Sequence, residues 1–135
     1  MIVVDTNVIS YFYLSSPYSV SAEQLFSKTP SWAAPLLWRS EFRNVLSFYV
    51  RKGIITLHDA MQLFATAASL LEGNEYEVNA AQVLKLSQES NCSAYDCEFV
   101  NLAQDLHVPL VTMDRKILQS FQGTAVSIEE YIENC

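Results

Sequence analysis

Basic residues are scarce in this sequence: 8 Lys and Arg stand against 15 Asp and Glu, which gives a formal net charge of −7 at pH 7. A protein that binds nucleic acids non-specifically needs a basic face, so this balance disfavours that class. Anionic substrates are not excluded, because carboxylates can hold cations that hold phosphates. Glycine and proline are scarce too, at 3 and 4 residues, whereas 50% of the chain is hydrophobic. This composition excludes disordered and low-complexity classes.

Cysteine is sparse as well, and no C-x-x-C spacing occurs among Cys92, Cys97 and Cys135. We interpret these residues as free thiols in a reducing compartment. Long hydrophobic runs are absent, since the longest stretch without a charge, residues 6–22, is interrupted by Asn, Ser and Pro. Residues 1–14 lack the cationic start of a signal peptide and contain an acid. The sequence therefore predicts a cytoplasmic protein with no membrane span.

Short apolar runs alternate with helical patterns along the 135 residues, a length that suits one domain with one core. The expected strands are residues 2–4, 32–34, 76–78, 109–112 and 125–126. The expected helices are residues 6–14, 21–28, 36–52, 56–71, 79–90, 93–106, 113–121 and a last one from 127, with caps at Thr6 or Asn7, Thr56, Asn79, Ser93 and Ser127. This alternation predicts right-handed βαβ crossovers, and hence an α/β fold whose parallel sheet has helices on both faces.

Two acidic residues follow expected strands, and two more lie in apolar helical stretches. Asp5 comes directly after the first strand and Asp114 shortly after the strand that ends at Thr112. Because function gathers at the carboxyl ends of parallel strands, both acids are expected at one edge of the sheet. Glu41 and Asp96 have core-type neighbours, where a carboxylate is costly to bury unless it is paired or bound to a cation.

Each acid also has an ordinary structural interpretation. Asp5, Asp96 and Asp114 each suit the start of a helix. Glu41 could pair with Arg43, although side chains two positions apart on a helix face away from each other. The set of four is more informative than any member, because none of the eight basic residues is an obvious buried partner for any of them.

Four sequence motifs carry these acids. They are VVDTN at residues 3–7, SE at 40–41, SAYD at 93–96 and LVTMD at 110–114. Together they resemble the acidic motifs of the PIN-domain ribonucleases, and especially the VapC-type toxins of prokaryotic toxin–antitoxin pairs. The resemblance implies a three-layer α/β/α sandwich with a central parallel sheet and a single PIN-like nuclease domain over residues 1–135. It also implies a Mg²⁺-dependent endoribonuclease that cuts RNA, is held in check by a small antitoxin protein, and forms a homodimer.

The resemblance assigns roles to individual residues. Asp5, Glu41, Asp96 and Asp114 would be the catalytic metal ligands, and Thr6, Asn7 and Thr112 would support them by hydrogen bonds. Independently of the family, four carboxylates without a well-placed histidine favour Mg²⁺ or Mn²⁺. Such ions bridge a phosphodiester and lower the pKa of bound water. Glu98 is left out of the ligand set, being two positions from Asp96. Carboxylates that converge without a cation repel one another, so at least one is expected to have a raised pKa.

Other residues give weaker signals. Arg115 and Lys116 adjoin Asp114 and suit either phosphate contact or ordinary surface charge. Asn44 shares the helix face of Glu41 and is a candidate contact to the site or to RNA. Two arginines of the same helix, Arg39 and Arg43, are expected to be solvated or to face a partner. Five aromatic residues exceed what one helix face can bury, so most should pack in the core and some should form a dimer or antitoxin surface: Tyr11, Phe12, Tyr13, Phe48 and Tyr49.

Three alternatives remain open at this point. A phosphatase of the haloacid-dehalogenase type also begins with a strand and an Asp, but it needs a second Asp where Asn7 stands. A PIN nuclease that acts in RNA processing rather than as a toxin would carry the same acids. A non-catalytic PIN-like interaction module would show no response to divalent metal, and the presence of all four acids argues against it.

Overall fold

The computed structural model describes residues 1–134, in which strands and helices alternate as the sequence predicts. The strands are β1 (Ile2–Val4), β2 (Trp32–Pro35), β3 (Glu75–Tyr76), β4 (Leu110–Val111) and β5 (Ala125–Val126). The helices are α1 (Thr6–Tyr13), α2 (Ser19–Lys28), α3 (Leu37–Arg51), α4 (Leu57–Leu70), α5 (Ala80–Gln88), α6 (Ala94–Leu106), α7 (Arg115–Ser120) and α8 (Ile128–Glu133).

The strands form one sheet in the order β3-β2-β1-β4-β5, and every pair of neighbours is parallel. At its centre, Val3 pairs with Ala33 of β2 on one side and with Leu110 of β4 on the other. The chain first builds outwards from β1 through β2 to β3, and then crosses to β4 and β5 on the opposite side. The strand order therefore reverses between β1 and β4, which is where such sheets open a crevice for ligands.

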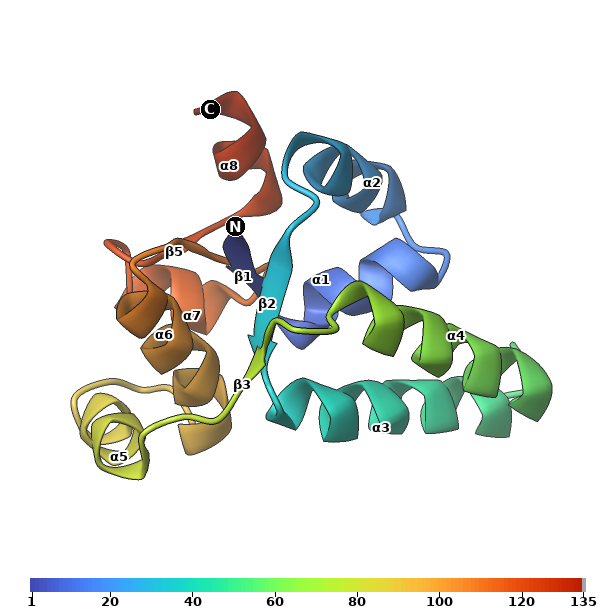
Figure 1. The fold of residues 1–135 in the computed structure, drawn as a ribbon, viewed down its shortest axis with the longest axis horizontal. Coiled ribbons are helices and arrows are strands. Elements are labelled where there is room, and N and C mark those ends of the chain that lie inside the picture. Colours follow the sequence, from blue (N-terminus) through green and yellow to red (C-terminus); the bar gives the residue numbers. More distant parts are fainter. Residues whose placement is uncertain (135) are drawn as a thin grey trace.

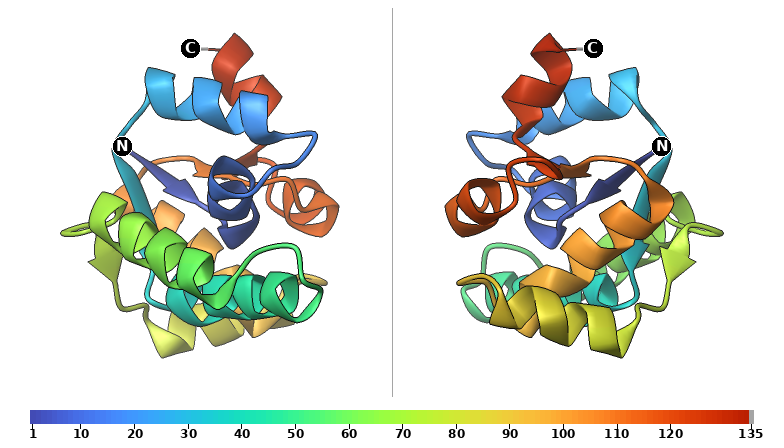
Figure 2. Two further views of the ribbon diagram at one scale, coloured as in Figure 1. Left: turned by 90° about the vertical axis from the view of Figure 1, so that its right-hand side faces the viewer. Right: turned by 90° about the vertical axis from the view of Figure 1, so that its left-hand side faces the viewer.

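Helices cover both faces of this sheet (Figures 1 and 2). On one face α6 packs against β1, β2 and β4, and α5 packs against α6. On the other face α1 contacts α2, α3 and α4, while α8 lies against α2. Helices α3 and α4 run side by side in Figure 1 as a hairpin. The predicted three-layer α/β/α sandwich is thus confirmed.

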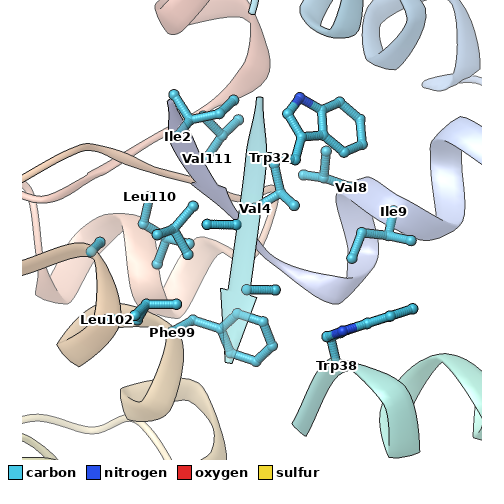
Figure 3. Packing of buried hydrophobic residues seen from close by; sticks show 14 of the residues in the cluster. Ile2, Val4, Val8, Ile9, Trp32, Trp38, Phe99, Leu102, Leu110 and Val111 are labelled. Atoms are coloured by element: carbon cyan, nitrogen blue, oxygen red, sulfur yellow. The ribbon is translucent and has the colours of Figure 1, made fainter. Parts of the chain in front are cut away.

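The core lies on both sides of β1. All three residues of this strand are fully buried, which explains why its sequence is continuously apolar rather than alternating. Figure 3 shows Ile9 of α1 and Leu102 of α6 approaching the strands from opposite sides. Large fully buried side chains complete the packing: Trp32, Trp38, Phe42 and Phe99. A sheet fixed in this way gives the residues after β1 and β4 a rigid base.

Four of the predicted helix caps are confirmed, and the first is wrong. The side chains that accept a backbone N–H at a helix start are those of Thr56, Asn79, Ser93 and Ser127. The first helix, however, is capped by Asp5, whose backbone is extended and whose carboxylate accepts the N–H of Thr6. The chain enters α1 directly from β1, so the cap is the last extended residue and Thr6 is already helical.

Local sequence also misplaced some element bounds. The third strand is Glu75–Tyr76 rather than 76–78, because these two residues pair with Ala34 and Pro35 of the neighbouring strand. Helix α2 begins at Ser19 rather than Ser21. The helix expected from 113 begins at Arg115. Pairing with β2 decides the bounds of β3, and the cap by Asp114 decides the start of α7.

Arg39, which the sequence suggested would be solvated or face a partner, is partly exposed and also forms a network within the chain. Its Nε and a terminal nitrogen donate to the two carboxylate oxygens of Glu75, at 2.6 and 2.8 Å. The indole N–H of Trp38 donates to the same carboxylate at 2.8 Å, and the guanidinium lies 5.8 Å from the ring centres of Trp38 and Phe64. The hydrogen bond from Arg39 holds the pKa of Glu75 below its ordinary value. This network ties α3 to β3.

We expect Glu75→Gln to lower the free energy of unfolding by about 1 kcal/mol at pH 7, because it weakens three hydrogen bonds, two of which form the partly exposed ion pair with Arg39. Exposed Glu72, three positions away, provides the matched control Glu72→Gln, which should change stability much less. Urea unfolding of the three proteins measures the effect. Equal stability of both variants would show that the network contributes nothing.

Two further sequence predictions concern cysteines and membrane spans. Cys92 and Cys97 are buried free thiols, as expected, and Cys135 lies outside the described residues. Within residues 1–134, no helix combines the length and apolar character that crossing a membrane requires.

Candidate functional site

A pocket of about 480 Å³ opens at the carboxyl end of β1, between α1 and α3. The four acids that the sequence singled out all line it: Asp5, Glu41, Asp96 and Asp114. They come from the end of β1, the first half of α3, the first turn of α6 and the cap of α7. The fold thus brings together four side chains that are up to 109 positions apart in the sequence.

Asp5 is the most buried of these acids, with 9% of its surface exposed. One carboxylate oxygen accepts the N–H of Thr6 at 2.7 Å, and the other accepts the hydroxyl of Thr112 at 2.7 Å. Burial raises the pKa of Asp5 to about 7, although the bonds from Thr112 and Thr6 lower it and nearby Glu41 and Asp96 raise it further. The raised pKa that we expected is confirmed, but its first cause is burial rather than repulsion.

Glu41 is held toward the same pocket by the neighbouring helix. The hydroxyl of Thr6 donates to one of its carboxylate oxygens at 2.7 Å. Burial raises its pKa, with further upward contributions from the charges of Asp96 and Glu98. Thr6 therefore connects two acids: its backbone N–H binds Asp5 and its hydroxyl binds Glu41.

Thr112 forms the corresponding connection on the other side of Asp5. Its fully buried hydroxyl donates to Asp5 and accepts the backbone N–H of Asp114 at 3.0 Å. Asn7 contributes more weakly: its side-chain oxygen accepts the N–H of Met113, and its nitrogen lies 3.5 Å from Asp5. The predicted supporting residues thus make the hydrogen bonds that position the loops after β1 and β4.

Asp96 and Asp114 each line the pocket and begin a helix. Asp114 caps α7, where one of its oxygens accepts the N–H groups of Lys116 and Ile117. Asp96 and Ser93 form a capping box at the start of α6. The cap interpretation and the site interpretation are therefore compatible, because each helix start uses one carboxylate oxygen and leaves the other without a hydrogen-bond partner among residues 1–134.

The pocket has no basic partner for its acids. Within residues 1–134, none of the four forms an ion pair, and neither a Lys nor an Arg lines the pocket. As they stand, no three of the described His, Cys, Asp and Glu side chains are arranged to hold a metal ion. The pocket is thus strongly acidic, with the buried Asp5 at its base.

Comparison with known proteins places this arrangement in a family. Residues 2–121 match the PIN domain family. The chain belongs to the PIN domain family. PIN domains are generally nucleases and generally use divalent metal ions. No curated protein matches the chain.

Solved structures share the PIN fold at low sequence identity. PAE2754 from Pyrobaculum aerophilum has a TM-score of 0.78 at 20% identity, covering 98% of this chain and 94% of its own. FitAcB from Neisseria gonorrhoeae has a TM-score of 0.75 at 15% identity, covering 96% and 99%. A toxin–antitoxin complex from Klebsiella pneumoniae has a TM-score of 0.68 at 21% identity, covering 95% and 98%. At these identities the likeness establishes the fold.

Of the other residues singled out in this PIN domain, Asn44 lines the pocket, whereas Arg115 and Lys116 are exposed at the start of α7 and do not. Glu98 does not line it either, although its charge raises the pKa of Glu41. Sequence analysis missed several lining residues, namely Ser10, Tyr11, Leu14, Ser16, Val45 and Tyr49. Helical spacing could have found four of them. Ser10 and Tyr11 lie three and four positions beyond Asn7, and Val45 and Tyr49 lie four and eight positions beyond Glu41, so each shares a helix face with a residue that the sequence singled out.

Burial of Asp5 predicts a pH-dependent stability. Its pKa is about 7 in the folded protein, whereas the ordinary pKa of an Asp side chain is 3.8. Between about pH 4 and pH 7, Asp5 is ionised in the unfolded chain but protonated in the folded protein. The free energy of unfolding therefore falls as pH rises, by up to about 1.4 kcal/mol per pH unit. Below this interval Asp5 is protonated in both the folded and the unfolded state. Above it Asp5 is ionised in both, and the free energy of unfolding falls no further on its account.

We therefore expect Asp5→Asn, which cannot ionise, to become more stable relative to wild type as pH rises from 4 to 7 in EDTA. Unfolding by urea at several pH values measures the difference. Asp105→Asn, at an exposed position of α6, is the control and should show no such trend. A difference between Asp5→Asn and wild type that does not vary with pH would contradict the raised pKa.

Proposed function

We propose that this PIN domain, residues 1–135, is an endoribonuclease that depends on Mg²⁺ or Mn²⁺ and acts as the toxin of a toxin–antitoxin pair. The observation that carries the proposal is the convergence of four acids, without any base, in one pocket of a fold whose members are generally nucleases. The pocket lies at the point where the strand order reverses, as ligand sites of such sheets do.

The donor set suits a hard divalent cation. All four acids offer oxygen, which Mg²⁺ and Mn²⁺ prefer. Glu41, Asp96 and Asp114 each have one carboxylate oxygen that accepts no hydrogen bond from the described residues. A bound cation would also offset the burial that disfavours ionised Asp5. We propose that these four side chains hold the ion, which would activate water and stabilise charge on the phosphate.

The chain's own residues would orient and move protons. Asp5 is fixed by bonds from two elements, so its oxygens are held in place before substrate arrives. Glu41 is half-exposed to the pocket with a raised pKa, which suits a group that orients the attacking water and accepts its proton. We propose Thr6 and Thr112 as positioning residues. Asn44, Arg115 and Lys116 are proposed RNA contacts.

The partner proposal rests on the structural neighbours, one of which is a toxin–antitoxin complex. An acidic pocket without its own bases suits an arginine of a small antitoxin, because a guanidinium fork matches carboxylate geometry. An antitoxin placed in this way would compete with the metal for the carboxylates and keep the nuclease inactive. We propose in addition that the chain forms a homodimer.

Cleavage of single-stranded RNA by the purified protein tests the activity. We expect cleavage in Mg²⁺ or Mn²⁺, none in EDTA, and recovery when excess metal is added back. Cleavage that persists in EDTA would overturn the metal-dependent mechanism. Intact RNA under all three conditions would instead favour a non-catalytic module.

A further inference from the structure

Tyrosine side chains adjoin the acids along the pocket between α1 and α3. Tyr11 lies one and a half turns beyond Asp5 on α1, and Tyr49 lies about two turns beyond Glu41 on α3. Both line the acidic pocket. The helical rise places Tyr11 about 8 Å and Tyr49 about 12 Å along their helices from Thr6 and Glu41. The pocket therefore has an acidic end and an aromatic end.

Part of each of these two rings is exposed and does not pack in the protein core. Tyr11 and Tyr49 are each partly exposed, and no described residue accepts or donates a hydrogen bond at either hydroxyl. Tyr18 contacts Tyr11 with ring centres 4.9 Å apart and is itself 42% exposed. Burial and the nearby Tyr18, Asp5 and Tyr49 raise the pKa of Tyr11, which shows how closely these groups gather.

Within residues 1–134, no Lys or Arg that could bind a phosphate backbone lines the pocket. The part of a substrate that enters the pocket must then be held by other side chains, whereas Arg115 and Lys116 lie outside it. Aromatic side chains bind unpaired bases by stacking on their faces, and this is the usual way in which proteins recognise single-stranded RNA. Bases within a duplex are already stacked on each other and cannot reach such a ring.

We propose that Tyr11 and Tyr49 form a nucleobase subsite that stacks a base flanking the scissile phosphate. This deepens the proposed function and rests on it. Tyr18, packed on Tyr11, supports that ring from the outside. The acids would then lie at the cut phosphate, and the tyrosines would hold the base beside it.

Kinetics of wild type and ring variants test the subsite. We expect Tyr11→Leu to raise KM for a single-stranded RNA about 5- to 150-fold, the effect of losing one stacked base, with a much smaller change in kcat. Tyr49→Leu should act in the same direction. Tyr11→Phe keeps the ring and should raise KM much less than Tyr11→Leu does. Phe48→Leu removes an exposed ring of α3 that does not line the pocket, and it should leave KM unchanged.

A binding measurement separates stacking from a folding defect. In the Asp114→Asn background, RNA carrying 2-aminopurine should lose fluorescence on binding when Tyr11 is present and less when it is Leu. A duplex of the same sequence should be cleaved much more slowly than the single strand.

Failure of the subsite and failure of the activity are distinguishable. If wild type cleaves RNA but both leucine variants keep its KM, or if duplex and single strand are cleaved equally, the subsite is wrong and the nuclease stands. If wild type cleaves no RNA in any metal, the proposed function is itself wrong.

Discussion

Asp5→Asn is expected to reduce RNA cleavage in Mg²⁺ by about a thousandfold or more, because the loss of several kcal/mol of charge stabilisation is worth that factor. The amide is nearly the same size, and it can still accept the N–H of Thr6 at the start of α1. The circular dichroism spectrum should therefore be unchanged. Since the same substitution should stabilise the metal-free fold above pH 4, activity and stability are expected to move in opposite directions.

Asp96→Asn should have an effect of similar size, and it has a matched control on the same helix. Asp105→Asn removes an equal charge from α6 at an exposed position outside the pocket, and it should keep the wild-type rate. Initial rates on one labelled RNA at saturating metal compare the three variants. Full activity of Asp5→Asn or of Asp96→Asn would remove that residue from the site.

Expression of the wild-type chain without a partner is expected to stop the growth of a bacterial host, whereas Asp114→Asn should permit normal growth. The reason is that Asp114 contributes a carboxylate to the pocket but its cap needs only one oxygen acceptor, which Asn retains. The variant should thus accumulate as folded protein without nuclease activity. Growth curves after induction, with immunoblots for equal expression, measure this effect.

Two outcomes of the growth experiment would change the account. Equal growth arrest by wild type and Asp114→Asn would mean that toxicity does not arise from the acidic pocket. Normal growth with active wild-type nuclease would favour a role in RNA processing over a role as a toxin. Asp105→Asn, at an exposed position outside the pocket, controls for the loss of one negative charge and should arrest growth as wild type does.

The acids of the site could be predicted because each carries a local signal. Asp5 directly follows an apolar β-branched strand, and Asp96 follows a serine cap by three positions. Strands placed by apolar runs, together with the parallel topology that alternation implies, then bring Asp5 and Asp114 to one edge of the sheet. The sequence could not exclude that Asp96 and Asp114 serve at helix starts, and the structure shows that both make such hydrogen bonds and also line the pocket.

Features that depend on distant partners were missed. Arg39 looked solvated because Glu75, its partner, is 36 positions away and belongs to a strand whose register is set by β2. Tyr11 and Tyr49 looked like surplus core aromatics, since only the contact between α1 and α3 turns both toward the acids. The burial of Asp5 likewise depends on the position of β1 at the centre of the sheet, and no local sequence pattern predicts it.

The central claim is that the four acids bind a divalent metal, and calorimetric titration of the metal-free protein with Mg²⁺ or Mn²⁺ tests it most directly. The account predicts saturable binding to wild type and to Asp105→Asn, and affinity weakened at least about tenfold in Asp5→Asn and Asp96→Asn. At a free metal concentration 100 times the dissociation constant, binding should also stabilise the wild-type fold by about 2.7 kcal/mol. No binding to wild type, or equal affinity in all four proteins, would contradict the account.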